Sequence, residues 1–163
     1  MSHHVAIVLA AGAGRKFFPY NLIRNKCAFP IGNESLVARN VRLLRELGFS
    51  QIVVVVGHEE ASIRAALHPL GTQDLLFVRQ PSSTPGTVPA TLAALAASPQ
   101  EAHSFLVVYG DIVVSLEDLR ATWQLHTKQG ATASTLCSLV KEGLVQDWIG
   151  CNLQGERAQG GNT

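Results

Sequence analysis

The sequence has few cysteines and little net charge. Its three cysteines, Cys27, Cys137 and Cys151, are widely spaced and form no C-x-x-C pair. This pattern excludes a disulfide framework and a zinc site, and it predicts free thiols in a reducing cytoplasm. The formal net charge is +1, without a face-sized cluster of lysine and arginine. A dedicated nucleic-acid surface is therefore not expected.

Long apolar runs are also missing. No run approaches the length of a membrane span, and the N-terminus lacks a signal-peptide pattern. The hydrophobic fraction of 47% and charged fraction of 15% are ordinary for a globular protein with much buried strand. At 163 residues, the chain is expected to form one domain, 1–163, with a polar, glycine-rich and flexible tail at 155–163.

Segments typical of strands and of helices alternate along the chain. The predicted strands are Val5–Leu9, Gln51–Gly57, Leu75–Arg79, Phe105–Tyr109, Ala131–Leu139 and Trp148–Leu153. The predicted helices are Ser35–Leu47, Glu59–Leu67, Thr87–Ala97 and Ser115–Gln129. Cys27–Ile31 is expected to be extended, but Pro30 excludes it from the centre of a sheet. The alternation predicts an α/β fold of three layers, αβα, with a mainly parallel sheet.

The first strand ends in a loop of small residues, Leu9–Gly14, that contains two glycines and leads into Arg15 and Lys16. Glycine lets backbone N–H groups approach a ligand that a Cβ would push away. Several such groups beside cations suit a polyphosphate. The alternative is a plain turn in an αβ scaffold. A dinucleotide fingerprint would need glycine where the chain has Phe17, so a nicotinamide or flavin site is not expected.

Three further side chains are candidates for chemistry. Asp111 follows a strand and can hold Mg²⁺ on nucleotide phosphates; the alternative is a turn or helix cap. Lys26, with Arg15 and Lys16, can neutralise a triphosphate; the alternative is a set of surface cations. Gln80 can donate and accept at a nucleobase edge; the alternative is a polar strand end. Ligands of such sheets lie outside the carboxyl ends of the strands, so these groups are expected to share one crevice.

Together, these segments resemble the sugar-1-phosphate nucleotidyltransferases, also called NDP-sugar pyrophosphorylases, over about residues 4–155. The resemblance rests on the opening L-A-A-G-A-G-R-K and on K-C-A-F-P-I-G-N-E-S-L-V, which begins at Lys26. Gln80, the Gly86-Thr87 pair and Tyr109-Gly110-Asp111 then follow in the family's order.

The resemblance implies a Rossmann-like fold of the nucleotide-diphospho-sugar transferase type. It also implies Mg²⁺-dependent transfer of a nucleotidyl group from an NTP to a sugar 1-phosphate. Arg15, Lys16 and Lys26 would be catalytic, Asp111 would bind the metal, and Gly150 would lie along the sugar. The implied nucleotide-binding residues are Leu9, Ala10, Ala11, Gly12, Ala13, Gly14, Gln80, Gly86, Thr87, Tyr109 and Gly110. Two alternatives stay open: a catalytically silent nucleotide or sugar sensor, and transfer to a non-sugar phosphate such as phosphocholine. A homo-oligomer also stays open, whereas nucleic acid and membrane are not expected partners.

The chain also departs from the family pattern. Lys16 stands where the family has arginine, and Arg15 where it has serine or threonine. Asn25 replaces the proline that precedes the lysine, and Glu34 replaces a basic residue. Family catalytic domains are longer, and their later part supplies sugar-binding residues and a second metal-binding aspartate. The chain is thus expected to be C-terminally truncated or a natural short form.

Overall fold

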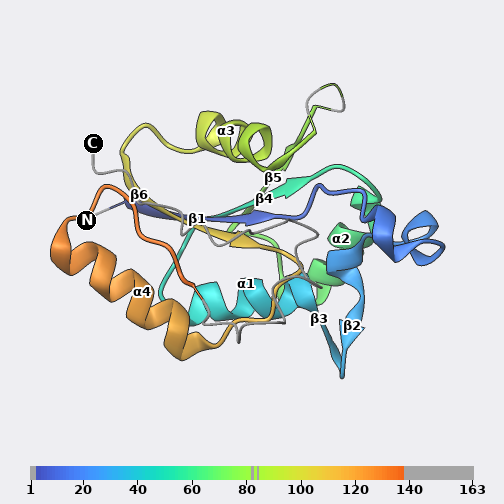
Figure 1. Cartoon of the computed structure of the whole chain (residues 1–163), viewed down its shortest axis with the longest axis horizontal. Coiled ribbons are helices and arrows are strands. Elements are labelled where there is room, and N and C mark those ends of the chain that lie inside the picture. The colour runs from blue at the N-terminus through green and yellow to red at the C-terminus, as the bar shows by residue number, and fades with distance from the viewer. Residues whose placement is uncertain (1–2, 82, 84, 138–163) are drawn as a thin grey trace, which may run out of the picture.

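The structure is a computed structural model that describes residues 3–81, 83 and 85–137. Within these residues, the main sheet has four parallel strands in the order β5-β4-β1-β6 (Figure 1). The strands are β1 (His3–Leu9), β4 (Ile52–Val56), β5 (Leu75–Arg79) and β6 (Ala102–Tyr109). A separate antiparallel hairpin joins β2 (Pro30–Ile31) to β3 (Glu34–Ser35). The helices are α1 (Leu36–Glu46), α2 (Glu60–Leu67), α3 (Thr87–Ala97) and α4 (Leu116–Gln129).

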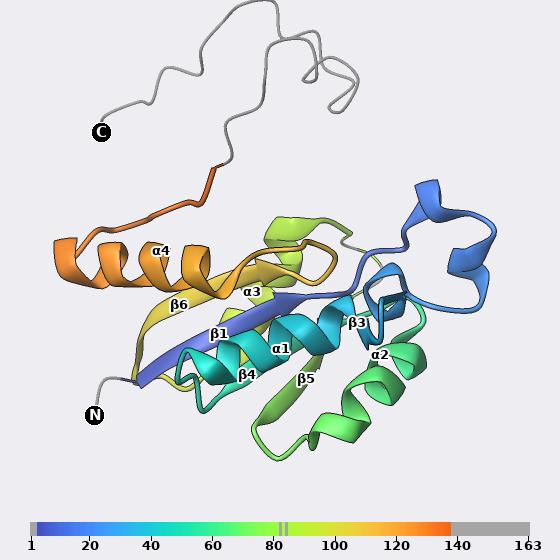
Figure 2. The same cartoon turned by 90° about the horizontal axis from the view of Figure 1, so that it is seen from below.

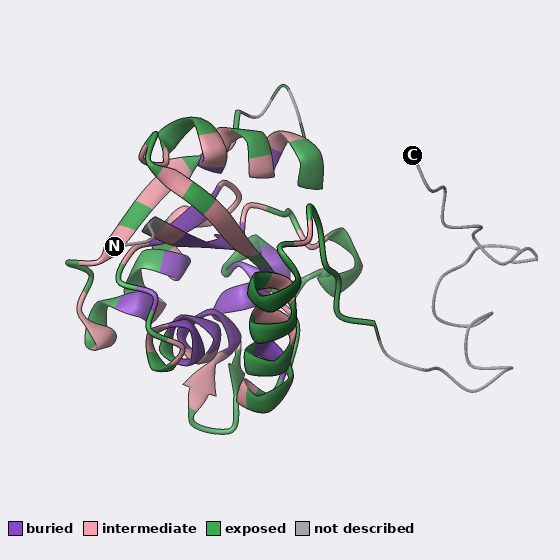
Figure 3. Cartoon of the chain, turned by 90° about the vertical axis from the view of Figure 1, so that its left-hand side faces the viewer, coloured by how far each residue is buried: buried purple, intermediate pink, exposed green. Residues whose placement is uncertain are grey.

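Helices cover both faces of the sheet, as the alternation predicted. The α3 helix lies on one face, while α1, α2 and α4 lie on the other (Figures 1 and 2). Alternate residues of β1 pack into the cores on the two faces of the sheet. Ala6 and Val8 belong to the core under α1, α2 and α4, and Val5 and Ile7 to the core under α3. All of β4 is buried, which explains its unbroken valine run (Figure 3).

The parallel register brings three strand ends to one edge. Leu9 at the end of β1 pairs with Val55 of β4 on one side and with Tyr109 of β6 on the other. Strands β1 and β6 end at Leu9 and Tyr109, and β4 ends one residue after Val55. The loop after β1, Gly57 and Gly110-Asp111 therefore emerge side by side, and this edge is where a ligand of a parallel sheet is expected.

Serine side chains cap the starts of α1 and α4, and a glycine ends α4, as the sequence predicts. The Ser115 Oγ accepts from the Asp118 amide at 3.0 Å and donates to the Asp118 Oδ2 at 2.6 Å. The Ser115 hydroxyl thus caps the helix, whereas the Asp118 carboxylate accepts from that hydroxyl and not from the Ser115 backbone N–H that a capping box would use. Gly130 ends α4 with a φ of 58°, in the left-handed region that glycine tolerates.

Two predictions about secondary structure are wrong. The segment 131–137 forms no strand, and 138–139 lie outside the described residues. Its alanines and threonines line a groove beside β6 and α4 without pairing to β6, and a strand exists only with a hydrogen-bonded neighbour. The predicted Cys27–Ile31 extension is wrong at its start, because Lys26–Ala28 is a 3₁₀ turn; Phe29 is extended, and Pro30–Ile31 is a strand outside the main sheet, as the proline predicted.

Other predictions fall on residues that the structure does not describe. They are the strand at Trp148–Leu153, the sugar-binding Gly150 and the tail at 155–163. Among the described residues, no helix is both long and apolar enough to cross a bilayer. The strand predicted at Phe105 begins earlier, at Ala102.

Candidate functional site

The carboxyl edge of the sheet contains a small cavity of about 180 Å³. Segments that follow β1, β5 and β6 enclose it, together with the turn at Lys26. Its lining comprises Leu9, Ala11, Gly12, Lys26, Cys27, Gln80, Gly86, Thr87, Ala90, Tyr109 and Asp111. A larger open cavity of about 800 Å³ shares Ala11, Gly12, Gln80 and Gly86 with it and adds Arg15, His58 and Arg79. The segments that the sequence placed in one crevice are thus neighbours in space.

The loop after β1 turns its carbonyl groups toward the protein. The side-chain amide of Asn25 donates to Ala10 O at 2.9 Å and lies 3.4 Å from Gly12 O. Ala11 O accepts from the His58 amide at 3.2 Å. Ala13 O accepts from the side-chain amide of Asn21 at 3.1 Å.

The amide groups of the same loop are differently placed. Within the described part of the chain, the N–H groups of Ala11, Gly12, Ala13 and Gly14 have no protein acceptor. A loop with tied carbonyls and unpaired N–H groups is suited to bind an anion. The Ala10 amide does not contribute, because it donates to Val55 O at 2.9 Å.

Two glycines let the strand ends approach closely. A Cβ at Gly57 would lie 2.8 Å from Ala11 O, and a Cβ at Gly110 would lie 3.0 Å from Leu9 O. The contact at Gly57 is shorter than real Cβ atoms show, so a larger residue there would displace the loop, and the contact at Gly110 is tighter than most real Cβ contacts. Gly57 was missed at the sequence level, although its position directly after a buried strand was visible.

Lys26 and Asp111 meet at the cavity. The Lys26 Nζ forms an ion pair with the Asp111 Oδ2, and the two side chains are 36% and 31% exposed. The stem of Lys26 packs against the loop, because a Cβ at Gly14 would lie 3.4 Å from Lys26 Cδ. Because both side chains are partly exposed, the ion pair can open. Lys26 can then contact an anionic ligand, and Asp111 can contact a metal ion.

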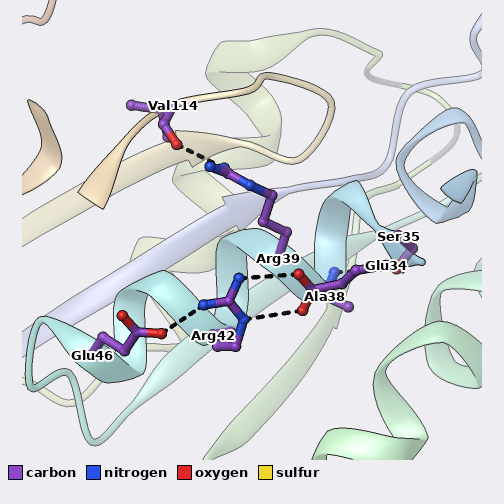
Figure 4. A network of polar contacts seen from close by, with 7 residues as sticks. All are labelled: Glu34, Ser35, Ala38, Arg39, Arg42, Glu46 and Val114. Carbon is purple, nitrogen blue, oxygen red and sulfur yellow. Dashed lines mark hydrogen bonds and ion pairs between the residues drawn. The ribbon is translucent and has the colours of Figure 1, made fainter. Parts of the chain in front are cut away.

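Helix α1 holds the segment that carries Asp111. The side-chain amide of Asn40 donates to Tyr109 O at 3.2 Å and to Ile112 O at 3.3 Å. Arg39, the residue before Asn40, donates to Val114 O at 2.7 Å (Figure 4). The segment is therefore fixed on both sides of the aspartate. On the exposed face of α1, Arg42 pairs with Glu34 and Glu46, also drawn in Figure 4.

Cys27 forms part of the cavity wall beneath this ion pair. Burial, and after it the nearby Asp111 carboxylate, raise the pKa of its thiol to about 12, although Lys26 acts in the opposite direction. The thiol is therefore neutral in the folded protein near neutral pH. It is a packing group and is not poised as a nucleophile.

Gln80 and the start of α3 close the third side. Gln80 Nε2 donates to Gly86 O at 2.9 Å, which ties the end of β5 to the residue that precedes α3. Gly86 has a φ of 125°, which favours glycine. The cavity touches Gly86, Thr87 and Ala90, so the N-terminal end of α3 faces it. Such an end favours negative charge.

Some predicted site residues stand apart from the cavity. Lys16 is exposed in a 3₁₀ turn and lines neither cavity, whereas Arg15 lines the larger one. Gly110 is buried, and its amide donates to Leu9 O at 2.9 Å. The structure therefore gives Gly110 a role in closing the strand edge.

The parallel αβα fold and an anion-facing loop at its carboxyl edge define a domain of the nucleotide-binding class. The chain belongs to the family of the MobA-like NTP transferase domain, whose model matches residues 6–144. It thus carries a nucleotidyltransferase domain, and the predicted fold class and family are confirmed.

Individual relatives agree with this assignment. The chain is 33% identical over 137 residues to the bifunctional protein GlmU of Geobacter metallireducens, covering 83% of this chain and 28% of that protein. It thus spans under a third of this curated relative. A putative glucose-1-phosphate thymidylyltransferase structure from Bacillus anthracis has a TM-score of 0.67 at 21% identity, covering 77% and 51% of the chains. UDP-glucose pyrophosphorylase from Acinetobacter baumannii has a TM-score of 0.66 at 22% identity, covering 80% and 54%.

Proposed function

We propose that the protein transfers a nucleotidyl group from an NTP to a sugar 1-phosphate. The products are an NDP-sugar and pyrophosphate. One observation carries the proposal: one cavity is lined by Ala11 and Gly12, whose amides have no protein acceptor among the described residues, by the Lys26 ammonium and by the Asp111 carboxylate. The first two groups suit a polyphosphate, and the third suits the metal ion that accompanies it.

The nucleotide is oriented by two parts of the site. The amides of Ala11–Gly14 bind its phosphates, and the N-terminal end of α3 adds favourable potential. Gln80 and Gly86 lie on the opposite wall and read the edge of the base, since an amide and a backbone group can each donate and accept. This assignment follows the resemblance and the cavity lining, and it leaves the base unspecified.

Asp111 is the residue that would hold Mg²⁺. Among the described residues, no group of three histidine, cysteine, aspartate or glutamate side chains could enclose a metal. A single carboxylate fits Mg²⁺ on a nucleotide, because this ion takes its other ligands from phosphate oxygens and water. When bound, the ion offsets the charge of the phosphates.

Lys26 and Arg15 supply the remaining positive charge. An oxygen of the sugar phosphate attacks the α-phosphorus of the NTP, a new P–O bond forms, and the bond to pyrophosphate breaks in line. The reaction needs no enzyme nucleophile, so the protein's contribution is positioning and electrostatic stabilisation. Lys26 neutralises the reacting phosphate and Arg15 the departing pyrophosphate. We keep a sugar acceptor from the resemblance and a cytoplasmic location from the cysteine pattern.

The test is a pyrophosphate-release assay on the full-length protein with Mg²⁺. Four NTPs are combined with a panel of sugar 1-phosphates and with phosphocholine. Release with one NTP and a sugar 1-phosphate supports the proposal. Release only with phosphocholine would show that the acceptor is not a sugar 1-phosphate. NTP binding without pyrophosphate release from any pair would favour the catalytically silent sensor.

A further inference from the structure

The three buried polar residues in the described part of the chain are all asparagines, Asn21, Asn25 and Asn40. Each one donates to backbone carbonyls at the carboxyl edge of the sheet. Asn25 is fully buried and makes the largest number of these contacts. Burying an amide is unfavourable unless its hydrogen bonds are satisfied, so its surroundings are informative.

The side chain of Asn25 holds two segments at once. Its Nδ2 donates to Ala10 O at 2.9 Å and to His58 O at 2.7 Å, with Gly12 O at 3.4 Å. These bonds tie the loop after β1 to the segment after β4. Its Oδ1 accepts from the Cys27 amide at 2.9 Å, which caps the 3₁₀ turn that begins at Lys26.

The backbone of Asn25 adds a third tie. Its N–H donates to the Ser62 Oγ at 2.9 Å, and that hydroxyl donates to Glu59 O at 2.7 Å. Glu59 has a φ of 49° and is the one non-glycine residue with positive φ in the described chain. Proline, which the family pattern has at this position, offers neither this N–H nor a side-chain amide.

We propose that Asn25 is a positioning residue of the nucleotide site, through which the loop and Lys26 share one rigid frame. No other side chain provides the same set of bonds. Aspartate has the shape but no donor, and glutamine is longer by a methylene. Because Asn25 turns the carbonyls of Ala10 and Gly12 inward, it leaves the N–H groups of the loop facing the phosphates. The inference rests on the proposed function.

The first experiment compares wild type, Asn25→Asp and Ile63→Val. Asn25→Asp keeps the shape and the Oδ1 acceptor but loses both donors. Ile63→Val is the control, because it removes one buried methyl group from α2 and leaves every hydrogen bond of Asn25 in place. NTP affinity is measured by calorimetry with Mg²⁺. Misplacing binding groups costs on the order of 100-fold, so we expect a loss of about that size in Asn25→Asp only.

The second readout is hydrogen exchange in the ligand-free protein. Asn25→Asp is expected to accelerate exchange at the amides of Ala10, Cys27 and Ala28, and Ile63→Val is not. Should Asn25→Asp fail to fold, Ser62→Ala removes the acceptor of the Asn25 N–H and the hydroxyl bond to Glu59 O, but it leaves the side-chain bonds of Asn25 in place. It is then expected to give a smaller effect in the same direction in both readouts.

The outcomes separate the two proposals. If Asn25→Asp, or Ser62→Ala in its place, behaves like Ile63→Val in affinity and exchange, the positioning role is overturned. If wild type binds no NTP, the proposed function fails and exchange alone decides. Faster exchange at Ala10 and Cys27 then supports the frame, and unchanged exchange overturns it.

Discussion

The Lys26 ammonium and the Asp111 carboxylate pair with each other across the cavity. They come from the turn before the hairpin and from the segment after β6, so the fold alone brings them together. A divalent cation that binds the same carboxylate would compete with Lys26. If Asp111 holds the metal as proposed, the pair couples metal binding to the release of the Lys26 ammonium toward phosphate.

Lys26→Met tests this coupling. Methionine keeps an apolar stem against Gly12 and Gly14 but removes the charge. Without its competitor, Asp111 is expected to bind Mn²⁺ several-fold more tightly in the absence of nucleotide, as measured by calorimetry. Pyrophosphate release is expected to fall by about 100-fold or more, since a stabilising charge is lost.

Lys128→Met is the matched control, because Lys128 is exposed at the end of α4. It is expected to change neither quantity. Unchanged Mn²⁺ affinity in Lys26→Met would show that the pair does not limit metal binding. An unchanged release rate would remove Lys26 from the proposed mechanism.

Gly12→Ala separates ligand approach from folding. A Cβ at Gly12 meets only Lys26 Cε at 3.8 Å, an ordinary contact, so the folded protein accommodates it. The free energy of unfolding is expected to stay the same or rise by about 0.4–1 kcal/mol, because the unfolded chain loses freedom. NTP affinity is nevertheless expected to fall, since the methyl group stands between the loop amides and phosphate.

Gly57→Ala is the companion variant. Its Cβ would lie 2.8 Å from Ala11 O, so it is expected to lose about 1–3 kcal/mol of stability by overpacking. Urea unfolding and calorimetry measure both quantities. If Gly12→Ala binds NTP as tightly as wild type, the loop is a plain turn.

Much of the fold could be predicted because its signals are local. The valine run of β4 marks a strand buried on both faces, and Ser115 with Gly130 marks both ends of α4. The crevice followed from a rule about the edges of parallel sheets. Asp111 and Lys26 were found because their residue types suit phosphate and metal.

The rest depends on long-range contacts that no local pattern encodes. Asn25 and Asn40 look like loop and helix-surface residues until the carbonyls within their reach are known. The strand predicted from Ala131 is absent over 131–137, because strand propensity depends on a partner strand. The 3₁₀ turns between 15 and 28 have no periodicity to detect.

Because the Cys27 thiol is buried, the free energy of unfolding is expected to fall at alkaline pH. This thiol has a raised pKa in the folded protein, from the ordinary 9.0 to about 12, mainly because it is buried. The unfolded state therefore loses its proton first as the pH rises. The contribution of the protonated thiol to the free energy of unfolding is therefore complete below pH 9. It falls between pH 9 and about pH 12, by up to about 1.4 kcal/mol per pH unit.

Urea unfolding of wild type and Cys27→Ala over this range checks the effect. The difference in unfolding free energy between the two is expected to shift against wild type as the pH rises. Alkylation is a second check: the exposed Cys137 reacts in the folded protein, and the buried Cys27 does not. A pH-independent difference, or equal labelling of the two thiols, would contradict the prediction.

Asn40 positions Asp111 from the opposite side of the site. Its amide donates to Tyr109 O and Ile112 O, the carbonyls that flank the aspartate segment. Asn40→Ala leaves these carbonyls without that donor, so the free energy of unfolding is expected to fall by about 1–3 kcal/mol. Because the carboxylate is then less well placed, the release rate at low Mg²⁺ is expected to fall several-fold and to recover at high Mg²⁺.

Val41→Ala distinguishes positioning from general destabilisation. Val41 is the next residue of α1 and is fully buried, so its truncation weakens the same helix by creating a cavity. It leaves the bonds to Tyr109 and Ile112 in place, and its release rate is expected to show the Mg²⁺ dependence of wild type. If both variants lose rate in proportion to stability and Mg²⁺ restores neither, Asn40 acts only on folding. If Mg²⁺ rescues Asn40→Ala alone, α1 sets the position of the metal ligand.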